Sequence, residues 1–226
     1  MRDIHWSASV RNMNLARLKE DLDAVADAGC DALHVDVMDG SFVSDFSLGF
    51  EMVEALIKNS TLSCEVHLQI EAPERYIERF ARAGCAAITI HAEACVHAHR
   101  VLTQIREAGA SPGIAINPGT PLTKLDYLLP QVDQVLVLAR DPIEGDRAPE
   151  STAFERVKIL RENISYREQR IRIHVEGGID AKSAAIFAHH GADTIVLDDA
   201  KLFGQGDGGA KLREYMEEAD AQRHVV

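Results

Sequence analysis

Cysteine is scarce in this sequence, and its pattern excludes a disulfide-stabilised scaffold. The 226 residues include four cysteines, and no two of them form a Cys-x-x-Cys pair. They are Cys30, Cys64, Cys85 and Cys95. Small secreted domains that depend on disulfides have a much higher cysteine density. We therefore expect reduced thiols in a cytoplasmic protein.

Long apolar runs are also missing. No run approaches the roughly eighteen apolar residues from which a membrane-spanning helix is inferred. Residues 1–6 lack the apolar core of a secretory signal. Neither a membrane anchor nor an exported precursor is expected.

Basic residues are outnumbered by acidic ones. Lys and Arg total 24 against 36 Asp and Glu, which gives a formal net charge of −12 at pH 7. A chain of this charge repels polyanions. We therefore expect no nucleic acid and no anionic membrane among its partners.

Apolar residues are plentiful, and they recur in short runs that predict a parallel sheet. Hydrophobic residues make up 46% of the chain. Four of the runs follow a helical pattern that ends in glycine, at Gly29, Gly84, Gly109 and Gly191. Each glycine suits the left-handed position after a helix. Continuous apolar strands are typical of a parallel sheet that is covered on both faces.

Eight strand-like runs alternate with eight helical patterns along the whole chain. The strands are expected near 4–9, 32–36, 63–70, 87–91, 112–116, 134–139, 170–175 and 194–197. The helices are expected near 14–28, 48–58, 73–83, 97–108, 122–129, 151–163, 180–190 and 209–220. This order predicts an α/β protein, a single (β/α)8 TIM barrel over residues 1–226, since such barrels typically have about 250 residues. An open doubly wound sheet is the alternative.

Ionisable residues occur inside several of the predicted strands. His34 and Asp36 are two residues apart, so both side chains point to one side of their strand. His67 lies in the next apolar run, and Glu176 follows the seventh. In a barrel, residues at the carboxyl ends of strands converge on the catalytic face.

Together these four residues predict a metal site. Imidazole and carboxylate ligands suit one divalent ion such as Zn, Mn, Fe or Co. Taken singly, an interior histidine is more often a hydrogen-bonded core residue, and a carboxylate at a strand end often caps the next helix. Four such residues at one predicted face favour the metal site.

The motifs around these residues identify a family. The chain resembles the ribulose-phosphate 3-epimerase family along most of its length. The resemblance is carried by Ser9, Asn14–Leu18, the His-Val-Asp-Val-Met-Asp-Gly run at 34–40, His67–Leu68, Asn117–Pro121 and Val175–Ile179.

The resemblance implies a metal-dependent isomerase that inverts C3 of a ketose or ketose phosphate, of the ribulose 5-phosphate and xylulose 5-phosphate type in carbohydrate metabolism. His34, Asp36, His67 and Glu176 would hold the metal. Asp36 and Glu176 would transfer protons on opposite faces of C3, through an enediolate. Ser9 would bind near the metal, and Met38 would pack over the intermediate. Gln69, Gly177, Gly178, Asp198 and Asp199 are further candidates for substrate binding because they lie at the ends of predicted strands. The resemblance also implies a homo-oligomer.

The sequence departs from the family pattern at three places. Glu176 stands where the family has Asp. The family's Gly-rich loop after strand six corresponds here to residues 139–147, with the single glycine Gly145 and charges of both signs. Asp198 and Asp199 stand where the family has the Gly-Ser that completes a phosphate site. Each carboxylate would repel a phosphate dianion by about 1 kcal/mol or more.

Three interpretations of the two aspartates follow. They bind hydroxyls of an unphosphorylated sugar, or Arg140, Arg147 or Lys201 forms a replacement anion site, for instance for a carboxylate. In the third, the aspartates point outward as a helix cap and leave the backbone N–H groups to phosphate. The alternative functions are an isomerase or lyase acting on an unphosphorylated or acidic substrate through an enediolate, and a non-catalytic sugar-binding protein.

Overall fold

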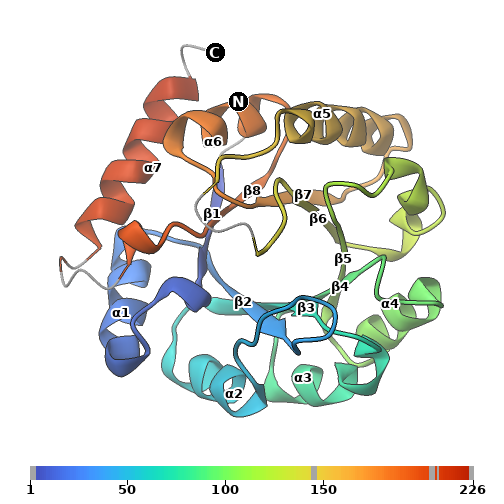
Figure 1. The fold of residues 1–226 in the computed structure, drawn as a ribbon, viewed down its shortest axis with the longest axis horizontal. Coiled ribbons are helices and arrows are strands. Elements are labelled where there is room, and N and C mark those ends of the chain that lie inside the picture. The colour runs from blue at the N-terminus through green and yellow to red at the C-terminus, as the bar shows by residue number, and fades with distance from the viewer. Residues whose placement is uncertain (1–3, 144–146, 204–206, 208, 224–226) are drawn as a thin grey trace.

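The strands form a closed parallel barrel. The computed structural model describes residues 4–143, 147–203, 207 and 209–223, so Gly145 and the chain ends lie outside the described residues. Eight strands pair in sequence order, and β8 pairs with β1. Figure 1 looks into this barrel, with the helices arranged around it. The (β/α)8 prediction is confirmed, and the open sheet is excluded.

The strands are short, as the apolar runs predicted. They are β1 His5–Ser9, β2 Ala32–Met38, β3 Ser63–Gln69, β4 Ala87–His91, β5 Ser111–Ile116, β6 Gln134–Leu138, β7 Arg172–Glu176 and β8 Thr194–Leu197. The α-helices of the described residues are α1 Leu18–Ala28, α2 Phe50–Asn59, α3 Ile77–Ala83, α4 Ala98–Glu107, α5 Ser151–Tyr166, α6 Ala181–His189 and α7 Ala210–Arg223. None of these helices is long and apolar enough to cross a membrane.

Alternation along the strands separates an apolar outer layer from the barrel interior. The interior carries polar side chains on β2, β3 and β7 and a small apolar cluster on β5, β6 and β8, formed by Ala115, Leu136, Leu138 and Val196. On β2, Leu33, Val35 and Val37 belong to the large core that the sheet shares with the helices. His34 and Asp36 point the other way, into the barrel. Residues 65, 67 and 69 of β3 and 174 and 176 of β7 follow the same pattern. Interior positions therefore hold the ionisable side chains.

The glycines that were expected to end helices have the predicted backbone conformation. The φ angles of Gly29, Gly84, Gly109 and Gly191 are 96°, 101°, 92° and 104°. An L-residue with a side chain rarely adopts this region. Each glycine thus reverses the chain between a helix and the strand that follows it.

One predicted helix is wrong. Residues 122–129 form no α-helix but two short 3-10 helices, Leu122–Leu125 and Leu129–Gln131. Pro130 lies in the second of them, and a proline disfavours the α-helical conformation of the residue before it. A further difference is that residues 15–17, expected in the first helix, form a separate 3-10 turn before α1.

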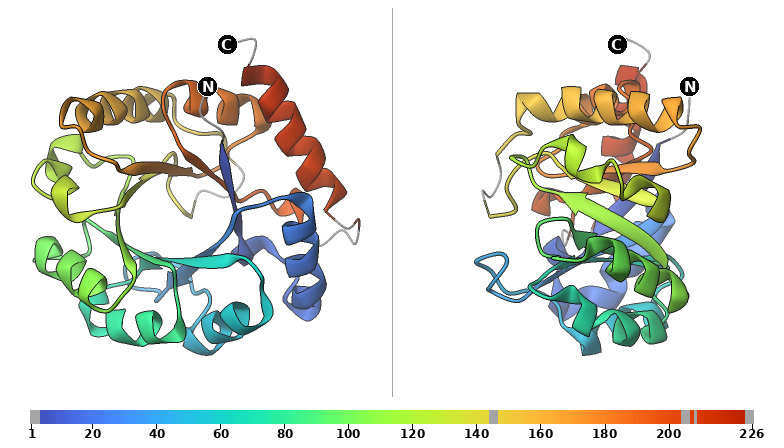
Figure 2. Two further views of the ribbon diagram at one scale, coloured as in Figure 1. Left: turned by 180° about the vertical axis from the view of Figure 1, so that it is seen from behind. Right: turned by 90° about the vertical axis from the view of Figure 1, so that its right-hand side faces the viewer.

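The carboxyl ends of the strands carry the long loops. The side view in Figure 2 shows the loop between β2 and α2 and the segment after β6 projecting from the same side of the barrel. Asp39 and Phe46 pair across the β2–α2 loop. Loops therefore extend from the end of the barrel at which the β2 residues His34 and Asp36 lie.

Candidate metal centre and active site

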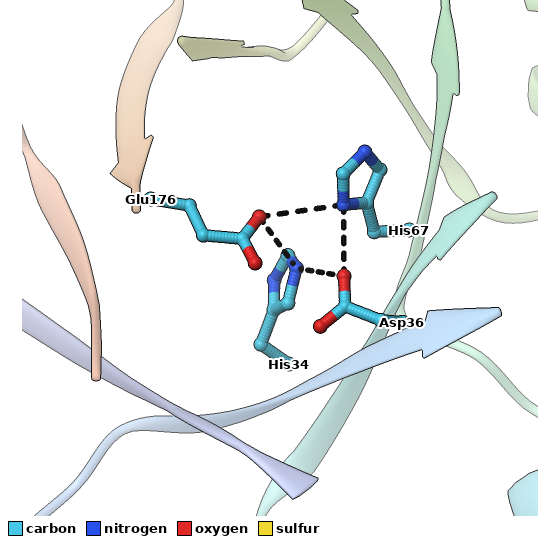
Figure 3. Close-up of side chains that lie close together, drawn as sticks. All are labelled: His34, Asp36, His67 and Glu176. Carbon is cyan, nitrogen blue, oxygen red and sulfur yellow. Dashed lines mark hydrogen bonds and ion pairs between the residues drawn. The ribbon is translucent and has the colours of Figure 1, made fainter. Parts of the chain in front are cut away.

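Four side chains converge at the carboxyl end of the barrel. His34 and Asp36 come from β2, His67 from β3 and Glu176 from the last position of β7 (Figure 3). One donor atom from each lies within 4.8 Å of the other three. The sequence-predicted ligands are thus brought together.

The donor atoms face one another closely. Asp36 Oδ1 lies 3.2 Å from His34 Nε2 and 3.0 Å from His67 Nδ1. Glu176 Oε2 lies 3.4 Å from each of these two nitrogen atoms. It has no hydrogen-bond partner among the described residues, although it is buried. A buried carboxylate oxygen that faces two imidazole nitrogens without a hydrogen bond is an arrangement in which a cation would satisfy all three atoms.

Mutual attraction keeps the carboxylates ionised. Burial alone raises the pKa of Asp36, but His34 and His67 outweigh it and hold that pKa well below its ordinary value. Burial and Asp36 raise the pKa of Glu176, yet the two imidazoles lower it overall. Burial lowers the pKa of His34, but Asp36 and Glu176 raise it well above its usual range. A metal ion would replace the protons that the imidazoles otherwise attract.

The donor set fits a divalent transition metal. Two imidazole nitrogens and two carboxylate oxygens are ligands shared by Zn, Mn, Fe and Co sites. All four side chains are buried, so the ion would be shielded from bulk water. The residues present therefore fit the cofactor that the resemblance implies.

Asp36 is held from several directions. Ser9 Oγ donates a hydrogen bond to Asp36 Oδ2 at 3.3 Å, and Gln69 Nε2 donates to Oδ1 at 2.9 Å. Ser47 Oγ bonds the Asp36 backbone oxygen at 2.6 Å. Ser9 and Gln69, both expected to bind substrate, thus contact the candidate metal ligand Asp36. Met38 is buried at the end of β2, two residues after Asp36.

A cavity of about 380 Å³ opens above the cluster. Its lining residues include Ser9, Arg11, Asn12, Asp36, Asp45, Leu138, Arg140, Ile143, Glu176, Gly177 and Asp198. Sequence reasoning missed Arg11, Asn12 and Asp45. Arg11 and Asn12 directly follow β1, so their place at a strand end was an available signal. Asp45 lies within the β2–α2 loop, where no periodic pattern indicated its direction.

Asp198 faces the cavity and binds the backbone beside the cluster. Its carboxylate accepts the Gly178 N–H, with Oδ2 at 3.1 Å, and Oδ2 also lies 3.1 Å from Arg140 Nη2. Burial and then the nearby Glu176 raise the pKa of Asp198, against the opposite effect of Gly178 and Arg140. The Asp198 carboxylate therefore takes up two groups that could otherwise bind an anion, the Gly178 N–H and the Arg140 guanidinium.

Asp199 behaves differently from its neighbour. Its side chain accepts the Lys201 N–H at 2.9 Å and caps the 3-10 helix Ala200–Leu202. Asp199 and Lys201 line an adjoining cavity of about 200 Å³, beyond Arg140 and Asp198. The cap of the third interpretation is therefore present at Asp199, where the carboxylate itself takes up the Lys201 N–H, and that interpretation is wrong for Asp198.

Of the three candidate anion-binding cations, Arg140 reaches the cavity above the cluster. Its Nη1 donates to the backbone oxygen of Arg147 at 3.2 Å. Gly178 has a φ of 65°, and a Cβ there would lie 2.0 Å from the same oxygen. The segment after β6 therefore packs directly on the Gly177–Gly178 turn after β7.

The barrel and its metal-donor cluster at the carboxyl ends of the strands define the class of protein, a (β/α)8 enzyme. Over residues 5–202 the chain matches the sequence pattern of the ribulose-phosphate 3 epimerase family. It is 36% identical over 207 residues to the chloroplastic ribulose-5-phosphate-3-epimerase of Arabidopsis thaliana, covering 91% of this chain and 73% of that protein. To the ribulose-phosphate 3-epimerase of Bacillus subtilis it is 33% identical over 212 residues, with 93% and 97% covered.

The chain belongs to the ribulose-phosphate 3-epimerase family and is a carbohydrate epimerase, an isomerase. Solved structures with the same fold include the tryptophan synthase α-subunit of Pyrococcus furiosus. Its TM-score is 0.68 at 15% identity, with 96% of this chain and 97% of that chain covered. That likeness is one of fold.

Proposed function

We propose that the protein is a metal-dependent epimerase that inverts C3 of a ketose phosphate of the ribulose 5-phosphate and xylulose 5-phosphate type. The observation that carries the proposal is the pair of buried carboxylates, Asp36 and Glu176, in one cluster with two imidazoles. The names of the curated relatives support the substrate type.

Two carboxylates on different strands suit a two-base epimerisation. One carboxylate removes the C3 proton, and the other returns a proton to the opposite face. Asp36 extends from β2 and Glu176 from β7, and they approach the centre from different sides (Figure 3). The carboxylate that acts as the base is ionised and the other carries the proton that is returned, and the two exchange these states when the reaction runs in the opposite direction.

The surrounding residues restrain the side chain of Asp36 more tightly than that of Glu176. Ser9 and Gln69 hold both oxygens of Asp36 in place. Glu176 Oε2 has no hydrogen-bond partner among the described residues, and its side chain has one more rotatable bond. We assign Asp36 as the fixed proton carrier and Glu176 as the more mobile one. A bound divalent ion would supply positive charge for the oxygens that become negative when the C3 proton leaves.

Substitution of Asp36 tests the proposal. Asp36→Asn keeps the shape but removes the base, so we expect exchange of the C3 proton in D2O to fall by about 10² to 10⁴-fold. Asp133→Asn, which changes an acid before β6 on the other end of the barrel, is the control and should retain activity. A wild-type protein that binds no divalent metal and exchanges no C3 proton of ribulose 5-phosphate or ribulose would overturn the proposal.

Asp198 favours a second candidate, in which the ketose carries no phosphate. The cavity lining includes two arginines, Arg11 and Arg140, against four acids. Arg11 pairs with Asp45 at 2.5 Å, and Arg140 pairs with Asp198. Both cations are therefore neutralised, and the Gly178 N–H is already bonded. A neutral hydroxyl fits beside these groups at lower electrostatic cost than a dianion.

A comparison of two substrates separates the candidates. The ratio of kcat/KM for ribulose 5-phosphate and ribulose is measured for the wild type and for Asp198→Ser. Under the second candidate the wild type prefers ribulose. Asp198→Ser should shift the ratio at least about tenfold towards ribulose 5-phosphate, because loss of the carboxylate makes phosphate binding more favourable by about 1.4 kcal/mol or more. A wild-type preference for the phosphorylated sugar overturns the second candidate and supports the first.

A further inference from the structure

A chain of buried polar groups continues from the cluster away from the cavity. His67 turns Nδ1 towards Asp36 and Glu176, and its other nitrogen points out of the cluster (Figure 3). That Nε2 lies 2.9 Å from Nε2 of His91, at the end of β4. His91 Nδ1 in turn lies 3.2 Å from Glu93 Oε2. Both imidazole side chains are fully buried.

Glu93 is an anchored end point for this chain. Its Oε1 accepts the Asn117 N–H at 2.9 Å and the hydroxyl of Thr120. Arg156 holds the same loop by donating to the backbone oxygens of Asn117 and Thr120 at 3.0 and 2.9 Å. Burial alone raises the pKa of Glu93, but the bonds from His91, Thr120 and Asn117 lower it to about 2. Glu93 is therefore an ionised acceptor.

Because Glu93 can only accept, it determines which nitrogen of His91 and of His67 carries a proton. A carboxylate accepts only, so His91 carries its proton on Nδ1. A neutral His91 then has a bare Nε2, which accepts from His67. His67 must donate with Nε2–H, and its neutral form keeps the Nδ1 electron pair free. That electron pair faces Asp36 and Glu176, where the cation would lie.

We propose that His91 and Glu93 are positioning residues that fix the tautomer and the ring orientation of His67, so that Nδ1 is presented to the divalent cation. The inference rests on the proposed metal site and deepens it. Outer partners of a metal-bound histidine orient the ring and raise its basicity, and removing them typically weakens metal binding 10- to 100-fold. Ring packing supports the same role, because Phe42 lies 4.7 Å from His91 between ring centroids.

Zn²⁺ affinity of the full chain tests the inference. The protein is freed of metal with a chelator, and Zn²⁺ binding is measured in competition with a chromophoric chelator. Glu93→Gln can offer an amide N–H to His91 and so permits the wrong tautomer, and His91→Phe keeps a ring without nitrogen. We expect each substitution to weaken Zn²⁺ binding by about 10- to 100-fold. Circular dichroism melting verifies that each variant is folded.

Two comparisons distinguish positioning from a merely structural role. Thr120→Val removes a bond to Glu93 but leaves the His91 contact, so its Zn²⁺ affinity should stay within about threefold of wild type, below the loss expected for an outer partner. The double variant that combines Glu93→Gln with His91→Phe should bind Zn²⁺ no more weakly than His91→Phe alone, because the effect of Glu93 passes through His91. Three results would each overturn the inference. They are a Zn²⁺ affinity of Glu93→Gln equal to that of wild type, losses of affinity that multiply in the double variant, and a loss in Thr120→Val as large as that in Glu93→Gln.

A spectroscopic measurement reads the tautomer directly and does not require His91→Phe to fold. In ¹H–¹⁵N correlation spectra of the Zn²⁺-loaded wild type, we expect protons on Nε2 of His67 and on Nδ1 of His91. A proton on Nε2 of His91 contradicts the inference. If the wild type binds no Zn²⁺, both the metal site and the inference fall. If Zn²⁺ binding follows the predicted pattern without C3 proton exchange, the proposed function alone fails.

Discussion

Glu176 shows how a single residue adapts the cluster. Its longer side chain brings Oε2 to 3.4 Å from His34 and from His67, so one oxygen serves both imidazoles. The four candidate ligands were predictable from strand-end positions and from the family motifs. The direction of Asp198 was not, because it depends on where Gly178 and Arg140 lie after the chain folds.

Shortening Glu176 tests this geometry. Glu176→Asp keeps the charge but withdraws the carboxylate by one methylene, so we expect metal affinity and kcat each to fall by about tenfold or more. Glu176→Gln keeps the length and loses the base, so its kcat should fall by about 10² to 10⁴-fold. Titration with Zn²⁺ and steady-state rates measure both. A Glu176→Asp variant as active as wild type would show that the added length has no role.

At the scale of elements, periodicity and glycine placement predicted nearly every strand and helix. The stretch 122–129 was an exception, because its apolar spacing resembles a helix while Pro130 limits the backbone. Helix α6 begins with a cap that involves two side chains. Asp180 accepts the Ser183 N–H at 2.7 Å, and Ser183 Oγ accepts the Asp180 N–H at 2.9 Å, which forms a capping box.

Removing this cap should destabilise the barrel without a change in the core. Asp180→Ala leaves first-turn N–H groups of α6 without the side-chain acceptor, and we expect the free energy of unfolding to fall by about 1 kcal/mol. Urea denaturation followed by circular dichroism measures it. Lys182→Ala, an exposed site in the same turn, should stay within about 0.5 kcal/mol of wild type. An equal loss in both variants would argue against the cap.

At the scale of the molecule, the shared core between the sheet and the helices encloses three cysteines. Cys30, Cys64 and Cys85 are all at most 5% exposed. Burial raises the pKa of Cys30 and Cys85 to about 12 and of Cys64 to about 11. Thiolates at these positions would be desolvated, so the folded protein retains thiol protons that the unfolded chain releases at lower pH.

Because of these buried thiols, we expect the free energy of unfolding to fall as the pH becomes alkaline. Because the folded pKa values lie above the unfolded value of about 8.5, the stabilisation is complete below that pH and is lost as pH rises towards 11–12. The loss reaches at most about 1.4 kcal/mol per pH unit for each thiol. Denaturation between pH 8 and 10 measures it, and Cys85→Ala should reduce the slope. In a Cys95→Ser background, a thiol reagent at pH 8 should react only after unfolding.

The sequence alone determined the barrel, the helix ends at glycine and the identity of the four candidate ligands, because these follow from local periodicity, backbone preference and strand-end position. Tertiary structure decided which oxygen and nitrogen atoms meet, that Asp198 turns inward while Asp199 caps a helix, and that His91 and Glu93 continue from His67. The physical reason is that these contacts join different strands and loops. Their distances depend on barrel closure and on how the segment after β6 packs against the Gly177–Gly178 turn.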